Sequence, residues 1–160
     1  MQHRLWTSKA LYRVVPAGRR SGKTAIAKRK LALAVSDIST KGQRYFAAAP
    51  TRDQAKRIYW DDLKKMVPRD IWAGKPSETA LTITTITGNE LAVVGMDRPE
   101  RIEGSPWDGG VLDEYANMKE EAWMSNVFPA LNTPGRPPGW CWMIGVPEGR
   151  NHYFDTWSKV

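Results

Sequence analysis

The segment Ala17–Thr24, which reads Ala-Gly-Arg-Arg-Ser-Gly-Lys-Thr, constrains the fold of this chain more than any other feature. It follows a short run that is typical of a strand, 11–15, and precedes a helical pattern over 24–35. In this order the backbone N–H groups of the loop and the positive end of the helix face the same anion. Ala17 stands where such a loop usually has its first glycine, but the context still predicts a phosphate site.

The bulk composition is that of one globular domain. The chain has 160 residues, of which 41% are hydrophobic, and this length suffices for a single domain with a core. No apolar run approaches the roughly 20 residues that span a bilayer, and the first residues lack the pattern of a secretory signal. The single cysteine, Cys141, excludes an intramolecular disulfide and a cysteine-based zinc site. We expect it in the core of a protein of the reducing cytoplasm.

The charge balance favours a polyanionic partner. The net charge is +7 and the pI is about 9.7, so nucleic acid is the first candidate, with a solvated basic surface as the alternative. Several cations lie in or just after the glycine loop: Arg19, Arg20, Lys23, Lys28, Arg29 and Lys30. Eight tryptophans are many for this length. Some could stack on bases, but we expect most of them in the core.

Further along the chain, strand and helix patterns alternate. Strand patterns cover 44–49, two runs around a turn at Gly88-Asn89, 109–112 and 139–146. Helical patterns cover the residues from 51 to about 67 and from 119 to 131. This alternation predicts an α/β fold with a mainly parallel sheet flanked by helices. Ligands of such sheets bind beyond the carboxyl ends of the strands.

The helix that begins after Pro50 has a clear start signal. Thr51 is an expected N-cap and Gln54, three residues on, is its expected capping-box partner. One side of this helix carries apolar residues that we expect to face the core. These residues are Ala55, Ile58, Tyr59, Leu63 and Met66.

Two motifs carry the chemistry of a nucleoside triphosphatase. In the loop, Lys23 supplies a cation for the β- and γ-phosphates and Thr24 supplies a hydroxyl for Mg²⁺. After the strand at 109–112, Asp113 can hold Mg²⁺ and Glu114 can orient and polarise the attacking water. Either motif alone is weak evidence, since a basic turn or an acidic pair is common on surfaces. Together, each at the end of a strand, they predict ATP hydrolysis.

Phosphoryl transfer also needs a cation on the equatorial oxygens of the transition state. The candidates are Arg19, Arg20, Arg98 and Arg101. Each of them could instead be an ordinary surface arginine, and the residues do not choose between them.

The combination of GRRSGKT, AAPTRDQAKRIYW, RPERIEGSPWDGGVLDEYANM and GVPEGRNHYFD resembles the ATPase domain of the large terminase subunit of tailed bacteriophages. The resemblance runs from about residue 2 to residue 155. It includes the unusual loop, because terminases often lack the first glycine and carry Gly-Arg early in the loop. It implies a P-loop NTPase fold of the RecA-like, ASCE type.

The resemblance also implies roles for individual residues. The adenine-reading glutamine corresponds to Gln2, and the segment 145–149 corresponds to the part of the family that couples hydrolysis to movement. Asp113 matches the metal-coordinating acid, with Thr24, and Glu114 matches the catalytic glutamate. Lys23, Arg19 and Arg101 are expected to assist catalysis. The nucleotide-binding residues are expected to be Gln2, Gly18, Arg19, Arg20, Ser21, Gly22, Lys23 and Thr24.

At the level of the whole protein, the resemblance implies a motor that uses ATP and Mg²⁺ to drive double-stranded DNA into a procapsid. The implied partners are DNA bound without sequence preference, a small terminase subunit, a portal protein and further copies of the chain in a ring. The implied location is the host cytoplasm, with no membrane partner.

Three departures from the family pattern stand out. Val146 replaces the usual hydroxyl residue of the coupling segment, and Glu103 replaces an arginine that often precedes the glycine at position 104. Arg101 or Arg98 would then have to supply the missing cation. The chain also has no nuclease domain, so we expect residues 1–160 to be a single ATPase domain, truncated relative to a full large terminase or encoded apart from its nuclease.

Two other interpretations of the motifs stay open. One is a fragment of a superfamily 1 or 2 helicase, because the loop and the Asp-Glu-Tyr-Ala segment at 113–116 also fit helicases. The other is a non-hydrolytic nucleotide-binding module in which ATP orders an assembly. Strand separation would favour the first, and nucleotide binding without turnover would favour the second.

Overall fold

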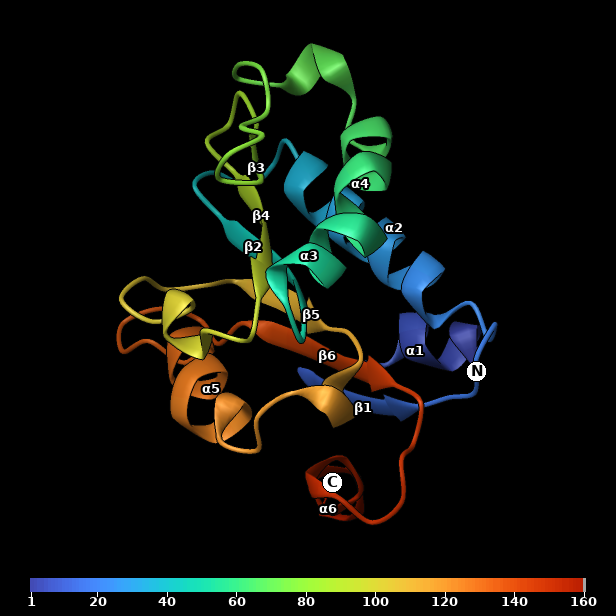
Figure 1. Ribbon diagram of the computed structural model, residues 1–160. Helices are drawn as coiled ribbons and strands as arrows, with labels where there is room; N and C mark the ends of the chain where they lie inside the picture. Colours follow the sequence, from blue (N-terminus) through green and yellow to red (C-terminus); the bar gives the residue numbers. More distant parts are fainter. Residues whose placement is uncertain (160) are drawn as a thin grey trace.

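The computed structural model describes residues 1–159, and a six-stranded sheet forms its centre (Figure 1). Along the sheet the strands follow the order β1-β6-β5-β2-β4-β3, and all neighbouring pairs are parallel except β3 and β4. The α/β class and the mainly parallel sheet expected from the sequence are therefore confirmed. The strands are β1 (Tyr12–Pro16), β2 (Arg44–Ala49), β3 (Thr82–Thr84), β4 (Glu90–Gly95), β5 (Gly109–Leu112) and β6 (Trp140–Gly145).

Helical segments cover both faces of this sheet (Figure 1). On one face lie α1 (Gln2–Thr7), α2 (Lys23–Ser36), and the continuous run of α3 (Arg52–Ala55), η1 (Lys56–Trp60) and α4 (Asp61–Met66). On the other face lie η4 (Tyr115–Asn117), η5 (Ala122–Val127), α5 (Phe128–Leu131) and α6 (His152–Ser158). Two short turns, η2 (Arg69–Ile71) and η3 (Pro99–Arg101), connect elements at the periphery. Within the described residues no helix has both the length and the apolar character to cross a bilayer.

The sheet separates two apolar cores. Side chains of α2, η1 and α4 pack on one face, and side chains of η4, η5 and α5 pack on the other. The strand β5 begins with two glycines because its neighbours are large, and a Cβ at Gly110 would clash with the ring of Phe46. Cys141 is fully buried, as expected. Four of the tryptophans are also buried, namely Trp60, Trp107, Trp123 and Trp142, whereas Trp6 and Trp157 are exposed.

The helical run after β2 begins as the sequence predicts. Thr51 and Gln54 form the reciprocal capping box, in which the Gln54 backbone N–H donates to Thr51 Oγ1. The middle of the run is a five-residue turn of π-helix, η1, which changes the angular register of the residues that follow. Tyr59 and Leu63 are fully buried, as expected. The prediction for Met66 is wrong: it is 36% exposed, at the end of α4 beside a surface cavity.

The sequence does not predict α1 or α6, and both have a weak pattern for the same reason. Each buries a single residue, Leu5 in α1 and Tyr153 in α6, so neither shows a helical apolar repeat. Polar contacts attach them instead. The guanidinium of Arg13 in β1 donates to the backbone carbonyls of Leu5, Ser8 and Ala10 and so holds α1 against the sheet edge.

Candidate functional site

The carboxyl ends of three neighbouring strands meet at one edge of the sheet. Because β6 lies between β1 and β5, the loop after β1, the acids after β5 and the segment after β6 adjoin one another. They line a cavity of about 430 Å³ together with Ile58 of η1. Six of the polar residues that line it come from the two predicted motifs: Arg19, Arg20, Lys23, Thr24, Asp113 and Glu114.

The glycine loop has the backbone shape of a phosphate-binding turn. Gly22 precedes α2 with a φ of 78°, and Arg20 is also left-handed at 60°, so the chain turns tightly before the helix. Lys23, the first residue of α2, is buried to 9% exposure, and its Nζ donates to the carbonyl of Gly18 at 3.3 Å. Ala17 is buried and its N–H donates to the carbonyl of Gly145 at 3.0 Å. Ala17, which stands where such loops usually have a glycine, thus connects the loop to β6 through this hydrogen bond.

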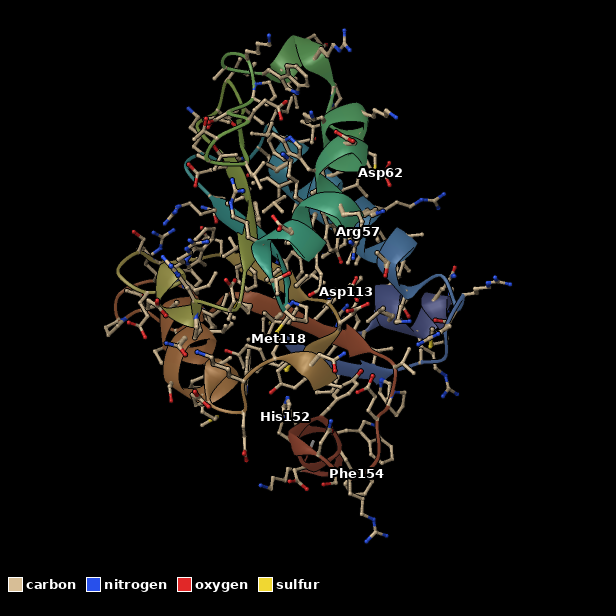
Figure 2. The ribbon with its side chains drawn as sticks, in the orientation of Figure 1. Arg57, Asp62, Asp113, Met118, His152 and Phe154 are labelled. Carbon is tan, nitrogen blue, oxygen red and sulfur yellow. The ribbon has the colours of Figure 1, made fainter. Side chains whose placement is uncertain are left out.

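Asp113 is the most tightly held side chain of the site. It is 2% exposed, and its Oδ2 accepts hydrogen bonds from Thr24 Oγ1 at 2.9 Å and from the Tyr59 hydroxyl at 2.8 Å. Its Oδ1 accepts from the backbone N–H of Glu114 at 2.9 Å. Thr24 and Asp113 are 89 residues apart in the chain, so this contact joins the two motifs. In Figure 2, Asp113 lies near the centre of the molecule.

Tyr59 is a residue of the candidate site that the sequence pattern places only in the core. It belongs to the π turn η1 and is fully buried. Burial and the neighbouring Asp113 carboxylate raise the pKa of Tyr59 well above 10, so its hydroxyl stays protonated as a donor to Asp113. The apolar helical pattern around Tyr59 does not predict a hydrogen bond from its hydroxyl to Asp113, because Asp113 lies 54 residues further along the sequence.

Glu114 follows Asp113 directly but is held differently. It lines the cavity and has a left-handed backbone, with φ 53° and ψ 41°. This conformation costs a residue with a Cβ about 1 kcal/mol or more, and such costs concentrate at functional sites. Within the described residues its carboxylate makes no hydrogen bond. The Glu114 carboxylate is therefore available to a ligand in the cavity.

Gln2 contacts the loop from the side of α1. Its Nε2 donates to the carbonyl of Ser21 at 3.1 Å, and Gly22 leaves the space that the Gln2 side chain occupies. Gln2 lines a second, larger cavity of about 870 Å³, which is mainly apolar and lies between α1, α2 and α4. Residues of the glycine loop thus line two cavities, one polar and one apolar. Adenine binding by Gln2 stays a prediction.

The other arginine candidates do not line the polar cavity. Arg101 belongs to η3, which follows β4, and β2 separates β4 from β5. Arg98 immediately precedes η3. Glu103, near the same turn, accepts a hydrogen bond from Asn126 Nδ2 and lines a different small cavity. Of the four candidates, only Arg19 and Arg20 lie at the polar cavity.

The donors of the polar cavity fit a triphosphate with Mg²⁺. Magnesium usually takes one or two protein oxygens and completes its shell with phosphates and water, and Thr24 and Asp113 present such oxygens side by side. No cluster of three or more His, Cys, Asp or Glu side chains suited to a metal occurs in residues 1–159. The buried Ser21 Oγ, in the loop, has no hydrogen-bond partner among these residues. Val146 and Glu148 bring the segment after β6 to the same cavity.

Comparison with known proteins gives one consistent relationship. No family model matches the chain. It is 26% identical to the large terminase subunit of Thermus virus P23-45, over 92% of this chain and 33% of that protein. The large terminase subunit of Thermus phage G20c is 25% identical over the same shares. The chain therefore spans about a third of the length of the curated relatives it matches.

Solved structures agree with this relationship. The large terminase ATPase domain of Thermus phage P74-26 superposes with a TM-score of 0.82 and 24% identity, over 96% of this chain and 66% of that one. The large terminase of a thermophilic bacteriophage, in complex with ATP-gamma-S, superposes with a TM-score of 0.65 and 21% identity, over 90% and 36%. The resemblance stated from the motifs is confirmed, and so is the P-loop NTPase fold of the ASCE type.

Proposed function

We propose that this chain is the ATP-hydrolysing motor domain of a viral DNA-packaging terminase. The observation that carries the proposal is the hydrogen bond of 2.9 Å between Thr24 Oγ1 and Asp113 Oδ2, in a cavity that Lys23 and Glu114 also line. This arrangement joins a phosphate loop to a metal-binding acid and a free carboxylate. The similarity to terminase large subunits supports packaging rather than strand separation.

The residues of the cavity divide the work of hydrolysis. Lys23 and the loop N–H groups hold the β- and γ-phosphates at the start of α2. Thr24 and Asp113 would hold Mg²⁺, which when bound neutralises charge on the phosphates. Glu114 orients and polarises the water that attacks the γ-phosphate, because its carboxylate faces the cavity without another partner. Arg19 stabilises the charge that develops on the transferred group.

The remaining site residues have roles at the edges of the cavity. Gln2 reads adenine from the apolar side, and Gly18, Arg20, Ser21 and Gly22 shape the loop around the phosphates. Arg101 does not line the cavity of its own chain. Its part in the reaction therefore requires a second copy that presents η3 to this site, as in a ring.

Double-stranded DNA is the proposed polyanion. The net charge of +7 supports contacts to phosphates without sequence preference. The remaining proposed partners are a small terminase subunit and a portal protein, in the host cytoplasm. Residues 1–160 act as a single ATPase domain within this machinery. Binding to duplex DNA should fall steeply between about 50 and 200 mM salt, because each neutralised phosphate releases counterions.

The experiment that tests the proposal is steady-state ATP turnover, with and without duplex DNA, for the wild type and Glu114→Gln. We expect the amide variant to lose turnover by a factor of about 10² to 10⁴, while its affinity for Mg²⁺ and nucleotide stays within about twofold. Glu121→Gln, a matched change at an exposed position, is the control and should retain turnover. Unchanged hydrolysis in Glu114→Gln would contradict the assignment, and a wild type that binds ATP without any turnover would favour an assembly module.

A further inference from the structure

The backbone of Glu114 needs support from its neighbours. Glu114 connects β5 to η4, and its left-handed backbone conformation is unfavourable for a residue with a Cβ. On one side the Asp113 carboxylate accepts from the Glu114 N–H. On the other side the Glu114 carbonyl accepts from Asn117 N–H at 2.9 Å, which closes the turn. The next carbonyl, that of Tyr115, accepts from the Met118 N–H at 3.1 Å within the turn. The carbonyls of Tyr115 and Ala116 also accept hydrogen bonds from outside the turn.

These two carbonyls are bound by consecutive residues at the start of α6. His152 Nε2 donates to the carbonyl of Tyr115 at 3.0 Å, and Asn151 Nδ2 donates to the carbonyl of Ala116 at 3.4 Å. The His152 ring also packs edge-on against the ring of Tyr115, with centroids 5.1 Å apart. In Figure 2, His152 lies on the side of α6 toward the segment that carries Asp113, and Phe154 lies on the far side.

Asn151 uses both ends of its amide. Its Oδ1 accepts from the N–H groups of Tyr153 and Phe154 and thereby caps α6. Capping requires only this oxygen, so the Nδ2 contact with Ala116 is an additional function of the same side chain. An asparagine that serves two elements at once joins the start of α6 to the turn after Glu114.

The end of β6 and the segment after it also lie close to Glu114. Gly145 packs so closely that a Cβ there would lie 3.3 Å from Tyr115 N, 3.5 Å from Glu114 Cα and 3.4 Å from the Tyr153 ring. The segment 146–150 separates Gly145 from Asn151, and two of its residues, Val146 and Glu148, line the nucleotide cavity. A shift of this segment on nucleotide binding would be transmitted directly to the two donors that hold the turn.

We propose that Asn151 and His152 are positioning residues that hold the Glu114 backbone in its left-handed conformation and thereby aim its carboxylate into the cavity. The expected effect on kcat rests on the proposed ATPase function, whereas the expected effect on the backbone of residues 113–118 does not. It assigns a role to the Asn-His pair beyond capping a terminal helix. It also makes the segment 146–150 the link between nucleotide contact and the catalytic carboxylate.

Two variants remove one hydrogen bond each and leave the rest of the structure in place. His152→Phe keeps a ring against Tyr115 but has no donor, and His152→Gln restores a donor at the position of Nε2. Asn151→Asp keeps the capping oxygen, since Asp caps helices as well as Asn does, but presents an acceptor to the Ala116 carbonyl. Asp155→Asn, an exposed change on the same helix, is the control.

Two measurements on the full chain decide the proposal: ATP turnover with nucleotide affinity, and amide hydrogen exchange of residues 113–118. For His152→Phe and Asn151→Asp we expect kcat to fall about tenfold or more, because a small misplacement of a catalytic group is costly. The nucleotide KM and Kd should change less than about twofold. Exchange of 113–118 should accelerate while that of β5 and β6 does not. His152→Gln should recover most of both losses.

Several results would overturn the inference. They are unchanged exchange of 113–118 in His152→Phe, unchanged kcat in that variant, a loss of nucleotide affinity that parallels the loss of kcat, or equal damage in His152→Gln and His152→Phe. If the wild type shows no turnover at all, the proposed function fails. The exchange of 113–118 then decides alone whether the Asn-His pair holds this turn.

Discussion

Asp113 and Glu114 are adjacent in sequence but are held by opposite means. The carboxylate of Asp113 is buried and receives hydrogen bonds from Thr24 of α2, Tyr59 of η1 and the backbone. The carboxylate of Glu114 has no such partner within residues 1–159, and the hydrogen bonds of this residue involve only its backbone N–H and carbonyl. The donors of α6 bind the carbonyls of the next two residues. The proposed metal-binding side of the cavity is thus held by side-chain hydrogen bonds. The proposed water-orienting side is held through the backbone and through the α6 donors to the two carbonyls that follow Glu114.

This contrast separates binding from turnover. Changes on the side of Lys23, Thr24 and Asp113 should weaken nucleotide or metal binding, since these groups contact charge directly. Changes on the side of Glu114 and α6 should lower kcat at unchanged affinity. The Glu114→Gln and His152→Phe experiments test whether changes near Glu114 lower kcat at unchanged affinity. Three further variants, at Lys23, Tyr59 and Val146, test the expected effects on binding, on the support of Asp113 and on DNA-stimulated turnover.

The largest effect on binding should come from Lys23→Ala. Removing the ammonium group takes away the charge-assisted contact to the phosphates, which corresponds to about 1.5–3 kcal/mol or more. We expect nucleotide affinity to fall at least about tenfold, measured by calorimetry with a non-hydrolysable ATP analogue and Mg²⁺. Lys119→Ala, at an exposed position, is the control. Equal affinity of Lys23→Ala and the control would remove Lys23 from the phosphate site.

An intermediate effect should come from Tyr59→Phe. The variant removes one hydrogen bond to the buried Asp113 carboxylate but leaves those from Thr24 and Glu114. We expect the free energy of unfolding in urea to fall by about 1.5–3 kcal/mol. The Mg²⁺ concentration for half-maximal nucleotide binding should also rise, because Asp113 is less firmly oriented.

The matched control for this variant is Tyr45→Phe. The Tyr45 hydroxyl makes no hydrogen bond within the part of the chain that the structure describes. Its loss should therefore cost less stability and leave the Mg²⁺ dependence unchanged. If the two variants behave alike, Tyr59 only fills the core and the account of Asp113 given above is wrong.

The smallest effect should come from Val146→Thr. The change adds a hydroxyl to the cavity where the terminase pattern usually has one, with nearly the same volume. We expect DNA-stimulated turnover to rise about threefold, the equivalent of one neutral hydrogen bond of about 0.6 kcal/mol, with nucleotide affinity unchanged. Val146→Ala, which has no hydroxyl, should show no such gain. A gain of turnover in both variants would show that the effect comes from the loss of the valine side chain and not from the added hydroxyl.

Much of this arrangement follows from local patterns. The β1-loop-α2 unit, the capping box at Thr51 and Gln54, and β5 with its two acids could be predicted because their signals are short-range. Helical and strand periods act over roughly four to twelve residues, so the sequence alone predicts these elements and the proposed chemistry of Lys23, Thr24, Asp113 and Glu114. It also identifies the relationship to terminases, since the motifs keep their order along the chain.

Only the tertiary structure decided which of these elements meet. The placement of β6 between β1 and β5 brings the segment 145–149 and α6 to the acids, and the π turn η1 directs Tyr59 onto Asp113. The partners in these contacts are between 35 and 89 residues apart. No local period carries such information, because the contacts form only when the whole sheet has been assembled. The sequence determined which reactive side chains follow β1 and β5, and the fold determined how the two carboxylates are held.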